Sequence, residues 1–229
     1  MRLFLSSVLL MLALNPVQVY ALLDDPVWLE VDGSQLPSWS YVDRTGAAKG
    51  GVVLLLGSGT SGAWPHSLAS MGDYLPDHGW HTVSIRADFE MNDSTNLAKR
   101  VNAAIGALPV VAGKPIVVIA AHSIARHVAL QQIEKGFSKQ PSAFVFLNRP
   151  VFEGEGEASK FHKEQLAILD LSDGATTKAE FWRHRRNLAA ENKQRFYKHV
   201  ALPLTGPNWT SKPDRLGKKI IGWLKRSYP

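Results

Sequence analysis

Short apolar runs alternate with amphipathic segments of helical length along most of the chain. Val52–Leu56 and Ile116–Ala121 are continuous apolar runs, the pattern of strands that are buried on both faces. Helical periodicity opens at Pro65 and ends at Gly79, and a second helix is capped near Asp93 or Ser94. The same pattern predicts strands at Val27–Val31, Trp39–Asp43, His81–Ile85, Ala143–Leu147, Leu166–Leu171 and Arg195–Leu202, and helices after Ser123, around Phe181–Ala189 and along Leu216–Leu224.

This alternation predicts an α/β fold of three layers, with about eight mostly parallel strands and helices on both faces of the sheet. The first two strands have no helix between them. The Asp32-Gly33 turn and Pro37 join them instead, so we expect an antiparallel hairpin at one edge. Only Glu153–Glu164 is available for a cap, which would be minimal.

The first 21 residues have the pattern of a signal peptide. Arg2 supplies a positive charge, Leu3–Leu14 an apolar stretch, and Val19-Tyr20-Ala21 a cleavage site that resembles the small-x-small pattern. Asn15 ends the apolar stretch after about 12 residues, below the roughly 20 needed to span a bilayer. We therefore expect cleavage near Ala21, export to the periplasm or the medium, a single domain over residues 22–229, and no stable membrane span after cleavage.

Composition narrows the chemistry that the chain can perform. The sequence has no cysteine, which excludes a thiol nucleophile and a cysteine-ligated metal. Its formal net charge is +6, and the basic residues are scattered apart from Arg183, Arg185 and Arg186 and a group in the C-terminal helix. These are read as solvated helix faces, with binding to anionic lipid or an envelope polymer as the alternative, and nothing indicates a nucleic-acid partner.

Several motifs resemble α/β-hydrolase domains, and more narrowly a bacterial domain-of-unknown-function family of exported, hydrolase-like proteins. The resemblance rests on Gly51–Gly59, Trp64-Pro65, Gly79–Ser84, Leu169–Leu171 and Gly222–Leu224. It covers roughly Trp28 to Arg226 and implies an α/β-hydrolase-like fold. The activity has to be judged from the residues of the site.

Ser123 is the candidate nucleophile. Ala121-His122-Ser123-Ile124-Ala125 joins an apolar run to a helical pattern, which is the setting of a nucleophile elbow with alanine in place of glycine. In that setting the backbone N–H groups of Ile124 and of Ser58, in the Gly-rich loop after Leu56, would form the oxyanion hole. The alternative is a serine that only caps the helix.

The partners of this serine are less well defined. Asp170 and Asp173 both lie where an orienting acid belongs, and Asp173 falls in a Ser-Asp-Gly sequence typical of a turn. The loop from Pro203 to Pro213 contains no histidine, and Asn208 stands near the expected position of the base. His199 is the remaining candidate, although it falls inside a predicted strand.

Two functions follow from these residues. The protein is either a degenerate hydrolase, inactive or weakly active, that binds a small molecule, an envelope polymer or a partner in the hydrolase cleft, or an active serine esterase or acyl hydrolase. The active form would use Ser123, His199 and Asp173, with Ser58 and Ile124 as the oxyanion hole. No residue spacing indicates a metal site or a cofactor.

Overall fold

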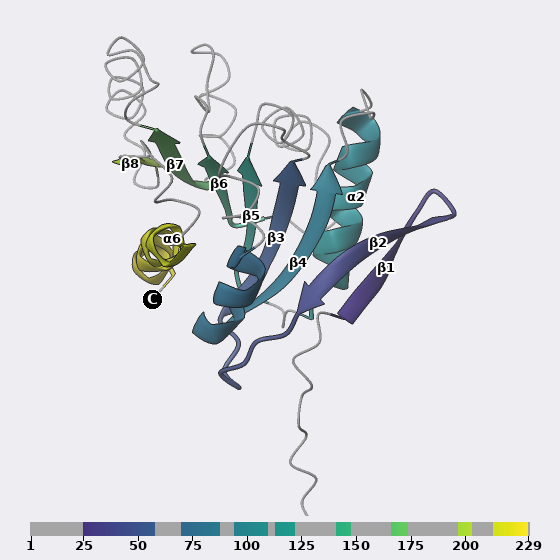
Figure 1. Cartoon of the computed structure of the whole chain (residues 1–229), viewed down its shortest axis with the longest axis horizontal. Helices are drawn as coiled ribbons and strands as arrows, with labels where there is room; N and C mark the ends of the chain where they lie inside the picture. Colours follow the sequence, from purple (N-terminus) through teal and green to yellow (C-terminus); the bar gives the residue numbers. More distant parts are fainter. Residues whose placement is uncertain are drawn as a thin grey trace, which may run out of the picture.

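The computed structural model describes residues 25–57, 70–87, 94–109, 113–121, 141–147, 166–173, 197–202 and 213–228. These residues form one eight-stranded sheet with the strand order β1-β2-β4-β3-β5-β6-β7-β8 (Figure 1). The strands are β1 (Asp25–Val31), β2 (Ser34–Tyr41), β3 (Gly50–Gly57), β4 (Trp80–Ala87), β5 (Ile116–Ala121), β6 (Ala143–Leu147), β7 (Ala167–Asp173) and β8 (Tyr197–Leu202). The helices are η1 (Pro76–His78), α2 (Ser94–Ala107) and α6 (Pro213–Ser227).

A tight turn sets the register of the edge hairpin, β1 and β2. Asp32 and Gly33 have φ angles of 51° and 76°, so both turn residues lie in the left-handed region that a two-residue hairpin loop requires. The turn brings Ser34 opposite Val31 and extends antiparallel pairing along all of β1. The prediction that the second strand begins at Trp39 was therefore wrong, because the turn forces pairing on a polar segment that has no strand pattern of its own.

From β4 onward the sheet is parallel, as expected, and β4, β3, β5, β6, β7 and β8 form a continuous ladder. The arrowheads of the central strands point toward one edge of the sheet (Figure 1). Val52, Val53 and Leu54 have no exposed surface, which is the burial on both faces that their apolar run predicts.

Two apolar layers cover the two faces of the sheet. On one face, which we call the α2 face, Leu97, Val101 and Ile105 of α2 pack against side chains from alternate positions of the strands. On the other, the α6 face, Leu216 and Ile220 of α6 pack together with the helical residues 70–75. The fold is thus the expected three-layer α/β architecture.

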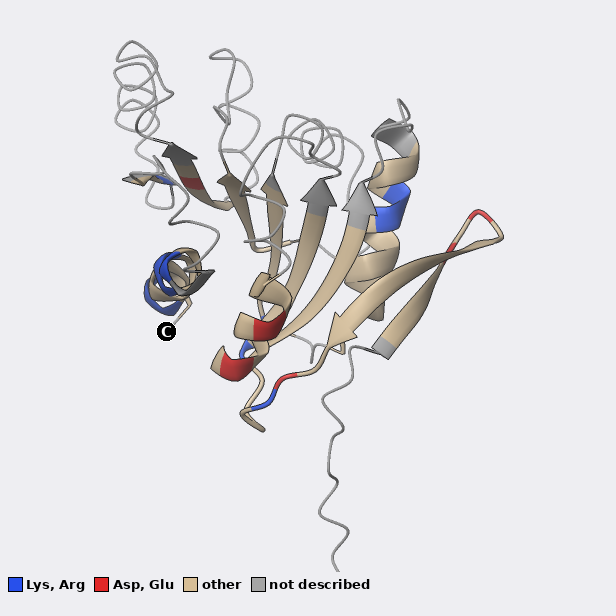
Figure 2. Cartoon of the chain, viewed as in Figure 1, with Lys and Arg blue, Asp and Glu red and all other residues tan. Residues whose placement is uncertain are grey.

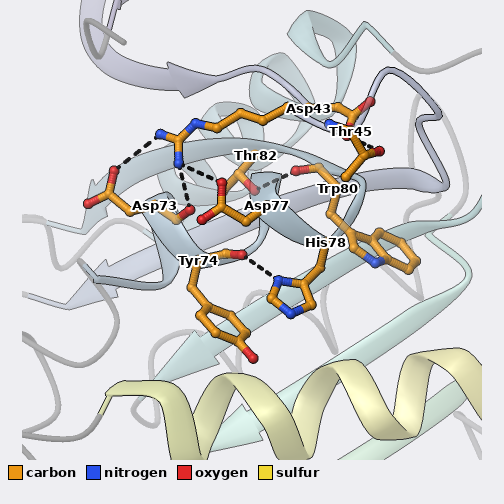
Figure 3. Close-up of polar contacts among 9 residues, drawn as sticks. Asp43, Thr45, Asp73, Tyr74, Asp77, His78, Trp80 and Thr82 are labelled. Atoms are coloured by element: carbon orange, nitrogen blue, oxygen red, sulfur yellow. Dashed lines mark hydrogen bonds and ion pairs between the residues drawn. The ribbon is translucent and has the colours of Figure 1, made fainter.

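Directional polar contacts hold the amino ends of the strands. Arg44, in the segment that joins β2 to β3, donates from Nη1 to Asp77 Oδ1 at 3.0 Å and to the Asp73 carbonyl at 3.1 Å (Figure 3). His78 Nδ1 donates to the Tyr74 carbonyl at 3.0 Å, and Gly79, with φ of 92°, ends the helical turn. These contacts tie the β2–β3 segment to the helical residues ahead of β4.

The last helix is fixed to the same end of the sheet. Gly217 lies so close to the Tyr74 ring that a Cβ at this position would clash with it. At the end of α6, the Tyr228 hydroxyl donates to the Ser142 carbonyl at 2.6 Å, just before β6 begins. Burial raises the pKa of Tyr228 to about 12.

Candidate functional site

The carboxyl ends of the parallel strands meet at one edge of the sheet, where the candidate chemistry was expected. Ala121 ends β5 in register with Leu147 of β6, which in turn pairs with Leu171 of β7. Ser123 follows Ala121 by two residues in the sequence. Asp173 lies two residues beyond Leu171 and pairs with Leu202 of β8. Crevices outside the carboxyl ends of such strands are the usual ligand sites of open α/β sheets.

Several sequence predictions lie outside the described residues. They are the nucleophile Ser123, the oxyanion donors Ser58 and Ile124, the signal peptide at residues 1–21, the cap at Glu153–Glu164 and the loop that contains Asn208. Their roles remain predictions. The described part of the site consists of the strand ends and of the polar residues of β7 and β8.

The structure corrects the local setting of both candidate acids. Asp173 is the last residue of β7, because the ladder with β8 continues to Leu202, and the residues that follow it lie outside the described ranges. Asp170 is not at a strand end, since β7 extends three residues past it and pairs with both neighbouring strands. The sequence pattern ended this strand too early because the polar residues after Leu171 interrupt the apolar run.

Asp170 and His199 lie side by side in one row across the sheet. The row runs through paired residues of five adjacent strands: Leu55, Ala120, Phe146, Asp170 and His199. Leu55, Ala120 and Phe146 belong to the apolar layer of the α2 face. Paired positions of a parallel ladder project to the same face, so Asp170 and His199 are directed to the α2 face as neighbours, with Cα atoms about 4.8 Å apart.

The burial of this pair is unusual for titratable residues. Asp170 is 0% exposed and His199 is half-buried. Asp170 is thus buried as deeply as the neighbouring Phe146, a 3% exposed member of the apolar core. A carboxylate moved from water into such surroundings loses several kcal/mol of hydration unless polar groups replace the water. Both Asp170 and His199 have interaction partners within the protein. We conclude that β7 and β8 hold a polar site that is built into the apolar α2 face.

The sheet separates this pair from the end of β5. Because β6 and β7 lie between β5 and β8, three strand spacings, about 14 Å in all, separate Ala120 from His199. His199 is also level with Ala120, one residue below the end of β5 at Ala121. The strand register thus brings His199 to Asp170 and leaves it far from the carboxyl end of β5.

The other described histidines make hydrogen bonds at the amino end of the sheet. His78 Nδ1 donates to the Tyr74 carbonyl, and His81 Nδ1 accepts a hydrogen bond from the Asp43 backbone N–H at 3.0 Å. Burial lowers the pKa of His81 and outweighs the opposing charge of Asp43, so the neutral acceptor form is favoured. Within the described ranges, no three His, Asp or Glu side chains are grouped so that they could hold a metal ion.

Comparison with solved structures identifies the architecture. Est1E from Butyrivibrio proteoclasticus is 10% identical, with a TM-score of 0.63 over 88% of this chain and 98% of the other. A dienelactone hydrolase from Anabaena variabilis is 16% identical, with a TM-score of 0.63 over 88% and 96%. A lidless α/β serine hydrolase from Xanthomonas campestris is 12% identical, with a TM-score of 0.58 over 90% and 95%. The chain has the α/β-hydrolase fold.

Sequence comparison gives less information about the family of this chain than the structural comparison gives about its fold. A family model described as a protein of unknown function (DUF3530) matches residues 17–105, less than half of the chain. This match agrees with the resemblance seen in the sequence motifs. No curated protein matches the sequence. The α/β-hydrolase fold is therefore established, whereas the function has to be argued from the site.

The pairing of Asp170 with His199 is the feature that sequence reasoning missed. The signal was present in Ala167–Leu171, where one aspartate interrupts an otherwise apolar strand. A charged residue at the centre of such a strand is expected to have a polar neighbour on an adjacent strand. The neighbour could not be identified from the sequence, because the register between β7 and β8 depends on the packing of the whole sheet.

Proposed function

We propose that this protein is a degenerate α/β hydrolase of the cell envelope. It keeps the hydrolase cleft at the carboxyl edge of the sheet and uses it to bind a small molecule, an envelope polymer or a partner, with little or no hydrolytic turnover. The observation that carries the proposal is the position of His199, which is level with the next-to-last residue of β5 and three strands away from it.

The geometry required of a general base supports this proposal. A base that takes a proton from a serine hydroxyl has to come within about 2.6–3.2 Å of it, directly or through one water molecule. The separation of about 14 Å between Ala120 of β5 and His199 of β8 exceeds the combined length of a histidine and a serine side chain. In addition, the His199 side chain projects from the α2 face and not along the sheet toward β5.

The sequence beyond β8 supports the same conclusion. In α/β hydrolases the base follows the last strand, on a loop that is free to turn back toward the nucleophile. Here residues 203–212 supply Asn208 and no histidine. An asparagine amide does not accept a proton at neutral pH, so a serine that depends on this loop would remain a poor nucleophile.

One observation favours the alternative, an active serine esterase. Ser123 follows the last residue of β5 by two positions in the sequence, and the structural neighbours include an esterase domain and dienelactone hydrolases. In the active form Ser123 would attack the ester carbonyl, the N–H groups of Ile124 and Ser58 would hold the oxyanion, and His199 oriented by Asp173 would take the proton. This form needs a rearrangement of β8 that brings His199 to Ser123 and to Asp173, because in the described sheet His199 pairs with Asp170 and Asp173 pairs with Leu202.

A fluorophosphonate probe separates the two functions, because it reacts with an activated serine and not with an ordinary hydroxyl. The purified protein, its Ser123→Ala variant and an unrelated active esterase would be treated under identical conditions. We expect the esterase to be labelled and the protein to show no labelling that depends on Ser123. Labelling that disappears in Ser123→Ala and in His199→Ala would overturn the degenerate assignment and establish the esterase.

The envelope location needs its own test. The proposal follows from the pattern of residues 1–21, which combines a positive charge, an apolar stretch and a cleavage site that resembles the small-x-small pattern. Fractionation of bacteria that express the whole chain should recover a shortened protein outside the cytoplasm. A chain that begins at residue 22 after an initiator methionine should stay in the cytoplasm. Equal distribution of the two chains would contradict export.

A further inference from the structure

The outer face of α6 carries five basic side chains in one stripe. Each of them is exposed, and Figure 2 shows the blue parts of the α6 ribbon on the side of the helix that is turned away from the sheet. At 3.6 residues per turn, all five fall within an arc of about 120° and extend over about 16 Å of helix. The α6 basic stripe consists of Arg215, Lys218, Lys219, Lys225 and Arg226.

Helix stability does not explain the stripe. Lys225 and Arg226 lie in the last turn, where the helix dipole favours positive charge. Arg215, Lys218 and Lys219 lie in the first half, where the dipole disfavours it, and their spacings of three and four residues place like charges next to each other. The helix contains a single acidic residue, Asp214, and no cation of the stripe forms an ion pair with another described residue.

The opposite face of α6 is unavailable for any other contact. Leu216, Ile220 and Leu224 have no exposed surface, the Tyr74 ring abuts Gly217, and Tyr228 is bonded to Ser142. The stripe is therefore held in place on a rigid helix before any partner arrives. Because the apolar side chains are committed to the core, a partner would be bound by charge and not by insertion of the helix.

We propose that the α6 basic stripe docks the protein onto the anionic headgroups of a phospholipid bilayer. A straight stripe on one side of a rigid helix presents all five cations at once to a flat, negatively charged surface. Contact through the stripe would hold the protein on the surface of the bilayer. No helix among the described residues is long and apolar enough to cross a membrane. The inference is independent of whether the hydrolase cleft is active.

The test compares two variants of equal net charge. Lys218→Gln, Lys219→Gln and Lys225→Gln together remove three charges from the stripe. Lys49→Gln, Lys99→Gln and Lys114→Gln together remove three exposed charges from other parts of the surface. Binding is measured by co-sedimentation with vesicles made of equal parts of phosphatidylcholine and phosphatidylglycerol, and with vesicles of phosphatidylcholine alone. Circular dichroism checks that both variants are folded.

The expected result is binding only to the anionic vesicles, with loss of that binding at high salt because ions screen the charges. Each removed lysine should weaken binding about fivefold, so the stripe variant should bind about a hundredfold more weakly. The variant with Lys218, Lys219 and Lys225 replaced by arginine should bind like the wild type. The control variant should lose far less affinity for the anionic vesicles than the stripe variant.

Three outcomes would overturn the proposal. An equal loss of vesicle affinity in the stripe variant and the control variant would show that binding depends on net charge alone. Absence of binding to anionic vesicles at low salt would remove the bilayer as a partner. Tighter binding to soluble dextran sulfate than to the vesicles, with the same dependence on the stripe, would make the partner an anionic polymer and not a bilayer.

Discussion

The central strands and the last two strands of the sheet are built from different kinds of residue. In β3, β5 and β6 the described buried side chains are all apolar, as in the run from Phe144 to Leu147. In β7 and β8 the same apolar row is continued by Asp170 and His199. Packing alone would favour apolar residues there too, so their polarity indicates a role other than stability. The centre of the sheet is a purely apolar core, and its β7–β8 side adds a titratable pair to the same row.

The largest expected effect tests the apolar half of this comparison. Phe144 is 1% exposed and stacks on Phe146, with ring centroids 5.7 Å apart. Phe144→Ala should lower the free energy of unfolding by about 3–5 kcal/mol, because it leaves a cavity in the core. Val200 is half-buried on β8, so Val200→Ala should lower the free energy of unfolding by about 1 kcal/mol or less. Urea unfolding measures both, and similar losses would contradict the difference between the two regions.

The polar half is tested by the interaction of Asp170 with His199. A double-mutant cycle of Asp170→Asn and His199→Gln should give a coupling free energy of about 0.5–3 kcal/mol, because neighbouring titratable groups do not act independently. Urea unfolding of the wild type, both single variants and the double variant supplies the four values.

A matched pair of positions controls for indirect effects. Lys198 precedes His199 on β8 but is exposed and projects to the opposite face of the sheet. Asp170→Asn and Lys198→Gln should therefore be additive within about 0.3–0.5 kcal/mol. Additivity in the Asp170–His199 cycle as well would show that the row contains two unrelated polar residues.

A smaller effect is expected at the amino end of the central strands. Tyr228→Phe removes the hydrogen bond to the Ser142 carbonyl and should lower the free energy of unfolding by about 0.5–1.5 kcal/mol at neutral pH. Folding raises the pKa of Tyr228 to about 12 from 10.0, so its contribution is complete below pH 10 and is lost between pH 10 and 12, where only the unfolded state ionises. Unfolding measured across this range should show a shallower decline for Tyr228→Phe, and parallel curves would contradict this.

The smallest effect is expected at the exposed ion pairs of Arg44. Arg44 bonds Asp77 and the Asp73 carbonyl, but the side chains of both aspartates are more than half exposed. Arg44→Gln should cost about 0.2–1 kcal/mol, since solvent and salt screen exposed ion pairs. The difference from wild type should shrink at high salt. A loss as large as that of Phe144→Ala would mean that the amino-end contacts, and not the apolar centre, stabilise the sheet.

The sequence predicts the parallel part of the fold closely because burial on both faces leaves a simple pattern. Ile116–Ala121 and Ala143–Leu147 are found as expected, since each apolar run is bounded by Pro115 or Ser142. The second strand was misplaced because Ser34–Pro37 pairs only through the constraint of the turn before it. Local pattern is thus a good guide where burial is symmetric, and a poor one where a neighbouring strand imposes the pairing.

The candidate site was harder to predict than the fold. The structure places the candidate acids Asp170 and Asp173 in β7 and the candidate base His199 in β8, and their catalytic roles stay predictions. The sequence could not decide between Asp170 and Asp173 as the neighbour of the histidine, because that choice depends on the register between β7 and β8. A shift of one residue in this register would move each side chain to the other face of the sheet. The structure assigns Asp170 to the row of His199 and Asp173 to the strand end.

The attachment of Tyr228 to Ser142 has a practical consequence for experiments on this protein. Ser142 immediately precedes β6, so the C-terminal end of the chain emerges at the side of the sheet opposite to the carboxyl ends of the strands. An affinity tag fused there, or a sensor chip that captures the protein through such a tag, would leave the carboxyl ends of the strands, where ligand binding is proposed, facing the solution. Immobilised protein should therefore be suitable for screening libraries of compounds.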